Sequence, residues 1–166
     1  RSSDLLNDLM NIVPVIRSLA YADANRVFLL GESRGSMMTF QALRDGFPAR
    51  AAATYGSWGD LTAMIESQPG AAAHIWPDLE QNREALVERR SALRWIDRVN
   101  APVLLLHGAD DGDTPVEGAR LIDAALTRAG KTHELRIFEG AHHTLQEVAA
   151  ERDAAAIAWF RRFDAR

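Results

Sequence analysis

The sequence contains no cysteine among its 166 residues. Disulfides are therefore excluded, and thiol catalysis and zinc–thiolate sites fall away with them. No apolar run approaches the roughly 20 residues of a membrane span, and no signal peptide opens the chain, so we expect no membrane partner. The net charge of −4 comes with basic side chains dispersed among acidic ones. This argues against nucleic acid as a partner, because phosphate binding needs clustered Lys and Arg.

The residues that are present indicate one compact α/β unit. The hydrophobic content of 47% is ordinary for a globular protein, and neither a repeat nor a linker divides residues 1–166. Strand-like runs alternate with helical patterns, which favours a parallel sheet with flanking helices. The expected strands lie near residues 27–30, 51–55, 102–106 and 133–138.

The segment 27–38 combines a strand, a tight turn and the start of an amphipathic helix, with Ser33 at the turn. Gly31 and Gly35 flank the serine, and a strained turn favours neighbours without bulky side chains. A GxSxG pattern in this context predicts a nucleophile elbow, which exposes the serine hydroxyl. The alternative is a serine in an ordinary strand–helix turn, which would leave the downstream motifs as coincidence.

Two later loops supply an acid and a base. The loop after the predicted strand 102–106 is rich in carboxylates, and the loop after strand 133–138 carries His142 and His143. The chain order is therefore serine, acid, histidine, as in α/β-hydrolases. The candidate acids are Asp110, Asp111 and Asp113.

Three segments, 31–39, 91–108 and 138–143, resemble the C-terminal part of an α/β-hydrolase of the prolyl oligopeptidase-like group, which includes dipeptidyl peptidases and acylaminoacyl peptidases. One departure is Ser36, which stands where the group usually has a glycine. The complete fold has about eight strands. The resemblance therefore implies the C-terminal half of that fold, with the N-terminal strands missing from this chain.

The resemblance assigns roles to three residues. Ser33 would be the nucleophile, His143 the general base and then acid, and Asp111 the group that orients the imidazole. The family pattern His-Gly-x-x-Asp-x-x-Val-Pro selects Asp111 over Asp110, and the pattern Gly-x-x-His selects His143 over His142. Because acyl transfer by this set uses protein groups alone, we expect no cofactor and no metal.

The remaining polar residues near these motifs have plainer interpretations. Asp113 directly precedes Thr114-Pro115-Val-Glu117, a predicted capping box, so we expect it at a helix N-terminus. His107 precedes a glycine at a strand end and is expected to be a structural histidine bonded to backbone. His142 is expected to be a solvated or hydrogen-bonded loop residue.

The oxyanion hole is only half accounted for. One donor would be the backbone N–H of Arg34, the residue after the nucleophile. The second donor normally comes from a loop well before the elbow, but residues 1–26 indicate a helix instead. The apolar positions that recur at helical spacing in it are Leu5, Leu9, Ile12, Ile16 and Leu19.

The segment of about 57–96 is predicted to form a lid-like insertion or a pocket wall. Trp58 and Trp76 are candidates for the substrate pocket, although tryptophans near loops more often anchor packing. A closing helix over about 146–163 is expected to be core, with four residues facing inward. These are Val148, Ile157, Trp159 and Phe160.

Two functions are compatible with the sequence. The first is a serine hydrolase that cleaves peptide or ester bonds of small-molecule substrates through an acyl-enzyme. The second is an incomplete hydrolase fragment that binds or assembles without turnover. The strand 27–30 would then present an unpaired edge, which favours self-association or pairing with a missing N-terminal segment.

Overall fold

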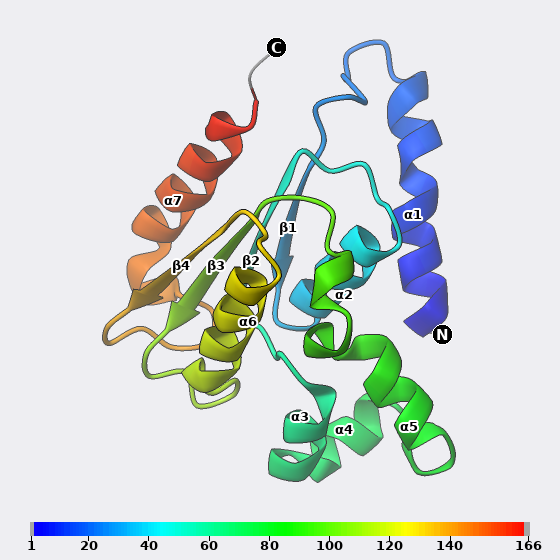
Figure 1. Cartoon of the computed structure of the whole chain (residues 1–166), viewed down its shortest axis with the longest axis vertical. Helices are drawn as coiled ribbons and strands as arrows, with labels where there is room; N and C mark the ends of the chain where they lie inside the picture. Colours follow the sequence, from blue (N-terminus) through cyan, green and yellow to red (C-terminus); the bar gives the residue numbers. More distant parts are fainter. Residues whose placement is uncertain (1, 165–166) are drawn as a thin grey trace.

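A four-stranded parallel sheet forms the centre of the molecule (Figure 1). The computed structural model describes residues 2–164, with side chains from residue 5 onward. The strands follow the chain in the order β1-β2-β3-β4, as the sequence predicts. Their bounds are β1 Phe28–Glu32, β2 Ala51–Tyr55, β3 Val103–Gly108 and β4 His133–Phe138.

Helices cover both faces of this sheet. α7 packs against β2 and β3 on one face, whereas α2 packs against β1 and β2, and α6 against β3 and β4, on the other. α1 lies outside α2, and the group α3–α5 lies beyond the carboxyl ends of the strands (Figure 1). The bounds are α1 Ser2–Ser18, α2 Arg34–Arg44, α3 Leu61–Ser67, α4 Pro69–Ile75, α5 Leu79–Arg90, α6 Val116–Arg128 and α7 Ala149–Arg162, with 3₁₀ turns at Ala92–Arg94, Ile96–Arg98 and Gln146–Val148. None of the described helices is long and apolar enough to cross a membrane.

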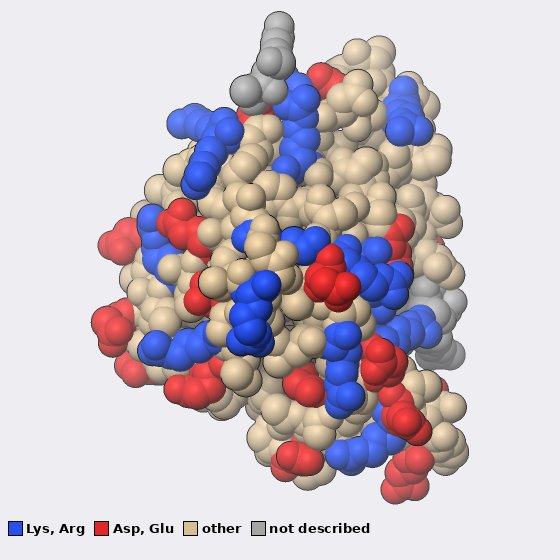
Figure 2. All heavy atoms as spheres, viewed as in Figure 1, with Lys and Arg blue, Asp and Glu red and all other residues tan. Residues whose placement is uncertain are grey.

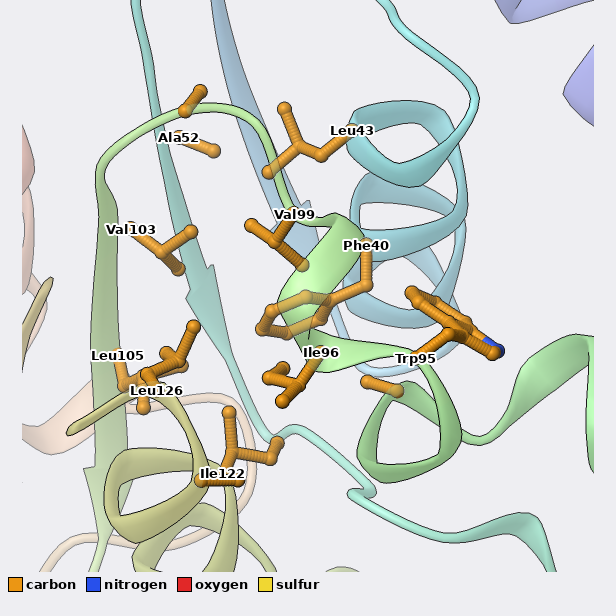
Figure 3. Close-up of a cluster of buried hydrophobic side chains, with 13 residues drawn as sticks. Phe40, Leu43, Ala52, Trp95, Ile96, Val99, Val103, Leu105, Ile122 and Leu126 are labelled. Carbon is orange, nitrogen blue, oxygen red and sulfur yellow. The ribbon is translucent and has the colours of Figure 1, made fainter. Parts of the chain in front are cut away.

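The two central strands are buried along their whole length. Continuous apolar sequence is typical of parallel strands covered on both faces. On the α2 and α6 side, Phe40 and Ile122 pack against Leu105 (Figure 3). On the other side, Leu104 packs with Trp159 of α7. This double core holds the carboxyl ends of β2 and β3 in fixed positions.

The first helix buries only part of the apolar set that recurs at helical spacing in its sequence. Leu6 and Val13 are buried against Phe47, whereas Leu5 is 56% exposed and Ile12 is 44% exposed. Of the predicted apolar positions, Leu9 packs against this cluster, whereas Leu5 and Ile12 do not. Apolar residues in α1 recur at helical spacing along both faces, so periodicity alone does not choose between them. The position of α2 makes the choice.

The closing helix likewise buries only part of its predicted apolar set. Trp159 is buried as expected, and Val148 and Phe160 are partly buried, but Ile157 is 49% exposed. The remaining buried positions are the small residues Ala155 and Ala156. Small side chains allow a helix to approach the sheet closely, and this decides which face turns inward.

Charged side chains are mixed over the surface. Acidic groups lie among basic ones on the face seen in Figure 2, in keeping with the net charge of −4. Such mixing produces little net field of either sign.

Candidate active site

Ser33 occupies a strained turn between β1 and α2. Its backbone has φ 52 and ψ −116, a region that side-chain-bearing residues rarely adopt and that is common at functional sites. The Ser33 N–H donates to the carbonyl of Tyr55 at 2.9 Å, which fixes the turn to β2. The serine therefore has the conformation expected of a nucleophile elbow.

The two elbow glycines are not equivalent. A Cβ on Gly31 would lie 2.4 Å from Thr39 Oγ1 and 2.5 Å from the Gly35 carbonyl oxygen. A Cβ on Gly35 would meet nothing within 4 Å. The space requirement that the sequence suggests for both positions therefore applies to Gly31 alone.

Asp111 lies in the loop after β3 and is buried. Its Oδ1 accepts hydrogen bonds from the backbone N–H groups of Asp113 and Thr114, at 2.9 and 2.8 Å. Its Oδ2 lies 2.7 Å from Thr114 Oγ1 and 2.9 Å from His143 Nδ1. Burial alone would raise the pKa of Asp111, but the hydrogen bonds from Thr114 and His143 outweigh it and lower the pKa. The carboxyl group is thus an anion fixed on both oxygens.

His143 follows β4 and reaches Asp111 because two glycines leave room. A Cβ on Gly56, which has φ +59, would lie 2.7 Å from His143 Cε1. A Cβ on Gly108 would lie 2.2 Å from the carbonyl oxygen of Ala141 in the histidine loop. Sequence reasoning missed the part played by Gly56, although a glycine directly after a buried strand is a usable signal.

Both rival acids differ from Asp111 in being exposed. Asp110 is exposed, and its backbone N–H donates to the Ala141 carbonyl at 3.1 Å. Asp113 is also exposed and lies before α6, which begins at Val116 after Pro115 with no side-chain cap. The predicted capping box is therefore wrong, because the Thr114 hydroxyl turns towards Asp111 instead.

The other two histidines of this region have the surroundings expected of them. His142 is exposed and lies 2.9 Å from Glu147. His107 is fully buried, and its Nε2 lies 2.8 Å from the Thr114 carbonyl oxygen. Because a carbonyl only accepts, Nε2 carries the proton of that bond. Burial lowers the pKa of His107, so its imidazole is neutral near pH 7.

A cavity of about 210 Å³ opens beside the elbow. Ser33 and His143 both line it, which brings the predicted nucleophile and base to one space. Trp58 is part of its wall, whereas Trp76 is buried elsewhere, 5.3 Å beneath the guanidinium of Arg90. The other lining residues are Arg34, Met64, Gln68, Ala71, Ile75 and Asp113. Sequence reasoning missed those from α3 and α4, since apolar residues on short helices carry no chemical signal.

The start of α2 forms one side of the cavity. Arg34 is the first residue of that helix and lines the cavity, so its backbone N–H is placed at a helix N-terminus that favours negative charge. Of the described residues, none before Ser33 lines this cavity.

One cluster could in principle hold a metal ion. Potential ligand atoms of Asp111, Asp113 and His143 lie within 4.8 Å of one another. The cluster overlaps the acid–histidine pair, and hydrogen bonds already engage both carboxylate oxygens of Asp111. We therefore assign no metal to it.

The chain has the fold of an α/β-hydrolase. Its parallel sheet is covered by helices on both faces, and a serine occupies the strained turn after the first strand. The sequence matches the prolyl oligopeptidase family over residues 3–164. The chain belongs to this family, whose members are serine peptidases.

Individual relatives agree with this placement. The chain is 29% identical over 151 residues to the uncharacterized peptidase YuxL of Bacillus subtilis, covering 88% of this chain and 23% of that protein. It is 26% identical over 168 residues to the acylamino-acid-releasing enzyme of Rattus norvegicus, covering 93% and 23%. The structure of a Mycobacterium tuberculosis puromycin-hydrolyzing peptidase superposes with a TM-score of 0.81 at 24% identity, covering 95% of this chain and 24% of that one. The chain thus spans about a quarter of the length of these relatives.

Proposed function

We propose that Ser33, His143 and Asp111 are the catalytic triad of a serine hydrolase that cleaves peptide or ester bonds. One observation carries the proposal. His143 is hydrogen-bonded through Nδ1 to the buried Asp111, and the same imidazole shares a cavity with the strained Ser33. Membership of a serine peptidase family supports the same activity.

The geometry suggests how each group would act. Asp111 is ionised and accepts a hydrogen bond from His143 Nδ1–H, so Nε2 is left unprotonated as the base that takes the Ser33 proton. Ser33 Oγ then attacks the carbonyl carbon, and the Arg34 N–H stabilises the oxyanion that forms. His143 returns the proton to the leaving group, which departs as an amine or alcohol. Water repeats the sequence on the acyl-enzyme, and no cofactor takes part.

The cavity wall favours an apolar group on the substrate. Trp58, Met64 and Ile75 contribute apolar surface next to Ser33. A volume of about 210 Å³ suits one side chain or a short acyl group. We therefore propose small peptides or esters with an apolar residue on the acyl side as substrates. The names of the relatives favour the peptide bond over the ester bond.

A second candidate function follows from the sheet edge. Among the described strands, β1 pairs with β2 alone, and Leu30 at this edge is 56% exposed. Exposed apolar edges recruit further strands. The alternative is thus a fragment that pairs with a second copy or with a preceding segment, and turns over substrate only in that assembly.

A fluorophosphonate probe tests the first function. We expect covalent labelling of the chain at Ser33, no labelling of Ser33→Ala, and strong loss of labelling in His143→Ala. The exposed neighbour His142→Ala is the matched control and should label normally. Labelling that appears only when the chain is joined to the preceding part of a longer relative would support the second function instead. Labelling that persists in Ser33→Ala would exclude the proposed nucleophile.

A further inference from the structure

Thr114 stands between the proposed acid and base. Its side chain is fully buried, and Oγ1 lies 2.7 Å from Asp111 Oδ2 and 2.6 Å from His143 Nδ1. With the 2.9 Å contact between Asp111 Oδ2 and His143 Nδ1, these three atoms form a closed triangle. A hydroxyl in such a position affects both partners at once.

The positions of the protons follow from the triangle. Asp111 is an anion, so its oxygen accepts, and the single hydroxyl proton of Thr114 is directed to this charged acceptor. The Thr114 oxygen then presents a lone pair to His143 Nδ1. Two lone pairs do not face each other at 2.6 Å, so Nδ1 carries a proton. That proton is shared between the Thr114 oxygen and the Asp111 carboxylate.

The opposite arrangement can be discarded on the same grounds. If the hydroxyl proton pointed to an unprotonated Nδ1, Asp111 Oδ2 would face lone pairs on both Thr114 and His143. Neither contact would then be favourable, and the buried carboxylate oxygen would lose both of its close donors. His107 Nε2 lies 3.4 Å from the same oxygen, but its proton is directed to the Thr114 carbonyl at 2.8 Å. Only the Nδ1–H form satisfies all three atoms.

We infer that Thr114 is a positioning residue that holds His143 in the Nδ1–H tautomer and fixes the plane of its ring, so that Nε2 is presented to Ser33. This inference rests on the proposed function for its catalytic consequence. Asp111 supplies the charge in this arrangement. Thr114 supplies the second acceptor that prevents the ring from swinging about its single contact with the carboxylate.

The backbone of Thr114 is itself held in place. Its N–H donates to Asp111 Oδ1 at 2.8 Å, and its carbonyl accepts from the buried His107 at 2.8 Å. His107 thereby connects the end of β3 to the loop that carries the hydroxyl. Two hydrogen bonds, one to Asp111 and one from His107, thus fix the backbone that carries the Thr114 hydroxyl.

The matched pair Thr114→Ser and Thr114→Ala tests the inference. Both variants lose the same methyl group, and they differ only in the hydroxyl. With ¹⁵N-labelled histidine, we expect the His143 Nδ1 proton to be observed and protected from exchange in the wild type and in Thr114→Ser. In Thr114→Ala the exchange should be at least about tenfold faster, because a donor held by one acceptor opens more readily.

The same pair gives a kinetic readout in any form of the protein that turns over. Thr114→Ala should lower kcat on the order of tenfold with little change in KM, since a displaced base slows chemistry rather than binding. Thr114→Ser should retain most of kcat. A merely structural role would make the two variants alike, and equal exchange and equal kcat in Ser and Ala would overturn the inference. Failure of the proposed function is distinguishable, because Ser33 would then resist the fluorophosphonate probe while the Nδ1 proton kept its Thr114 dependence.

Discussion

Two regions of the molecule differ in how well their side chains are buried and hydrogen-bonded: the acid–histidine corner, formed by Asp111, Thr114 and His143, and the edge of the sheet at β1. At the corner, Asp111 and Thr114 are buried with every side-chain oxygen engaged. At the edge, Leu30 of β1 is 56% exposed, and on the neighbouring α1 Leu5 and Val15 are exposed to a similar extent, 56% and 55%. The corner satisfies its own polar groups, whereas the edge leaves apolar area in water. The polar groups of the acid–histidine pair are therefore satisfied, whereas the apolar side chains at the β1 edge are not buried, and mutations at the two places should have separate effects.

The largest expected effect removes the nucleophile. Ser33→Ala should lower turnover on the order of 10⁶-fold, and His143→Ala should cost about as much because triad members act as a unit. The melting temperature should stay within a few degrees of the wild type in both variants, which circular dichroism would measure. Retention of more than a few per cent of the rate in Ser33→Ala would contradict the assignment.

Substitutions at two adjacent aspartates test the assignment of Asp111 as the acid. Asp111→Asn should reduce turnover by roughly 10⁴-fold, since an amide at this position favours the wrong histidine tautomer. Asp110→Asn is the matched control, because Asp110 is exposed and does not contact His143. Steady-state kinetics on both variants gives the comparison. A damaging Asp110→Asn together with a mild Asp111→Asn would reverse the choice between them.

A charged side chain introduced at the β1 edge tests whether this edge drives self-association. We expect the wild-type chain to self-associate through β1, and Leu30→Lys to shift it towards monomer in sedimentation velocity, because edge lysines block strand pairing. Leu121→Lys on α6 is the control, since Leu121 is also 56% exposed but lies far from β1 in sequence and fold. Joining the chain to the preceding part of a longer relative, which would supply a second oxyanion donor, should raise the rate by about 10² to 10³-fold.

A wild-type chain that sediments as a monomer at all concentrations, melts cooperatively and shows full activity would contradict this prediction. The β1 edge would then be stable in water without a pairing strand.

Substitution of the two elbow glycines by alanine should change the free energy of unfolding in opposite directions. Gly31→Ala should destabilise the protein by about 1–3 kcal/mol, because the added methyl group meets backbone that cannot yield. Gly35→Ala should be neutral or stabilising by roughly 0.5–1 kcal/mol, since Gly35 lies within α2 and alanine is the better helix former. Urea unfolding measures both. Equal losses would show that the two positions are under the same constraint.

The smallest effect concerns pH. The folded-state pKa of His107 lies below its usual 6.5, so below pH 6.5 the unfolded chain binds a proton that the native state does not, and stability falls. The lowered pKa of Asp111 contributes stability above its usual 3.8, which is lost as the pH falls through the folded value. His107→Gln should therefore flatten the decline between pH 6.5 and 3.8 and leave the lower part unchanged.

Urea unfolding at a series of pH values checks this prediction. Gln retains an amide that can donate to the Thr114 carbonyl, so the variant removes the titration and keeps the bond. The exposed His142→Gln serves as control and should leave the curve as it is. An unaltered decline in His107→Gln would assign the pH dependence to other groups.

The strands and the order of the site were predictable because they depend on local pattern. Continuous apolar runs mark β2 and β3, and GxSxG marks the turn at Ser33. The sequence does not determine which of two possible hydrogen-bond partners a side chain takes when both fit the local pattern. Thr114-Pro115-Val-Glu117 fits a capping box, yet the hydroxyl binds Asp111 because the buried anion is the stronger acceptor.

The same limit explains the cavity wall and the first helix. Trp58 and Trp76 are equivalent in sequence, but only Trp58 lines the cavity with Ser33. Leu5 and Leu6 are equivalent as helix residues, but only Leu6 faces α2. In each case a residue distant in the chain determines which of the two side chains is buried or lines the cavity, and this contact cannot be read from a single sequence.

The bond from the Ser33 N–H to the Tyr55 carbonyl gives the elbow a dynamic role beyond its geometry. This bond lies where β1 leaves the sheet, so any fraying of the β1 edge that reaches the turn must break it. The Ser33 amide proton should therefore exchange with solvent at the frequency of that opening, and a second strand on the outer side of β1 should slow it. The exchange rate of the Ser33 amide proton would thus measure how often this turn opens.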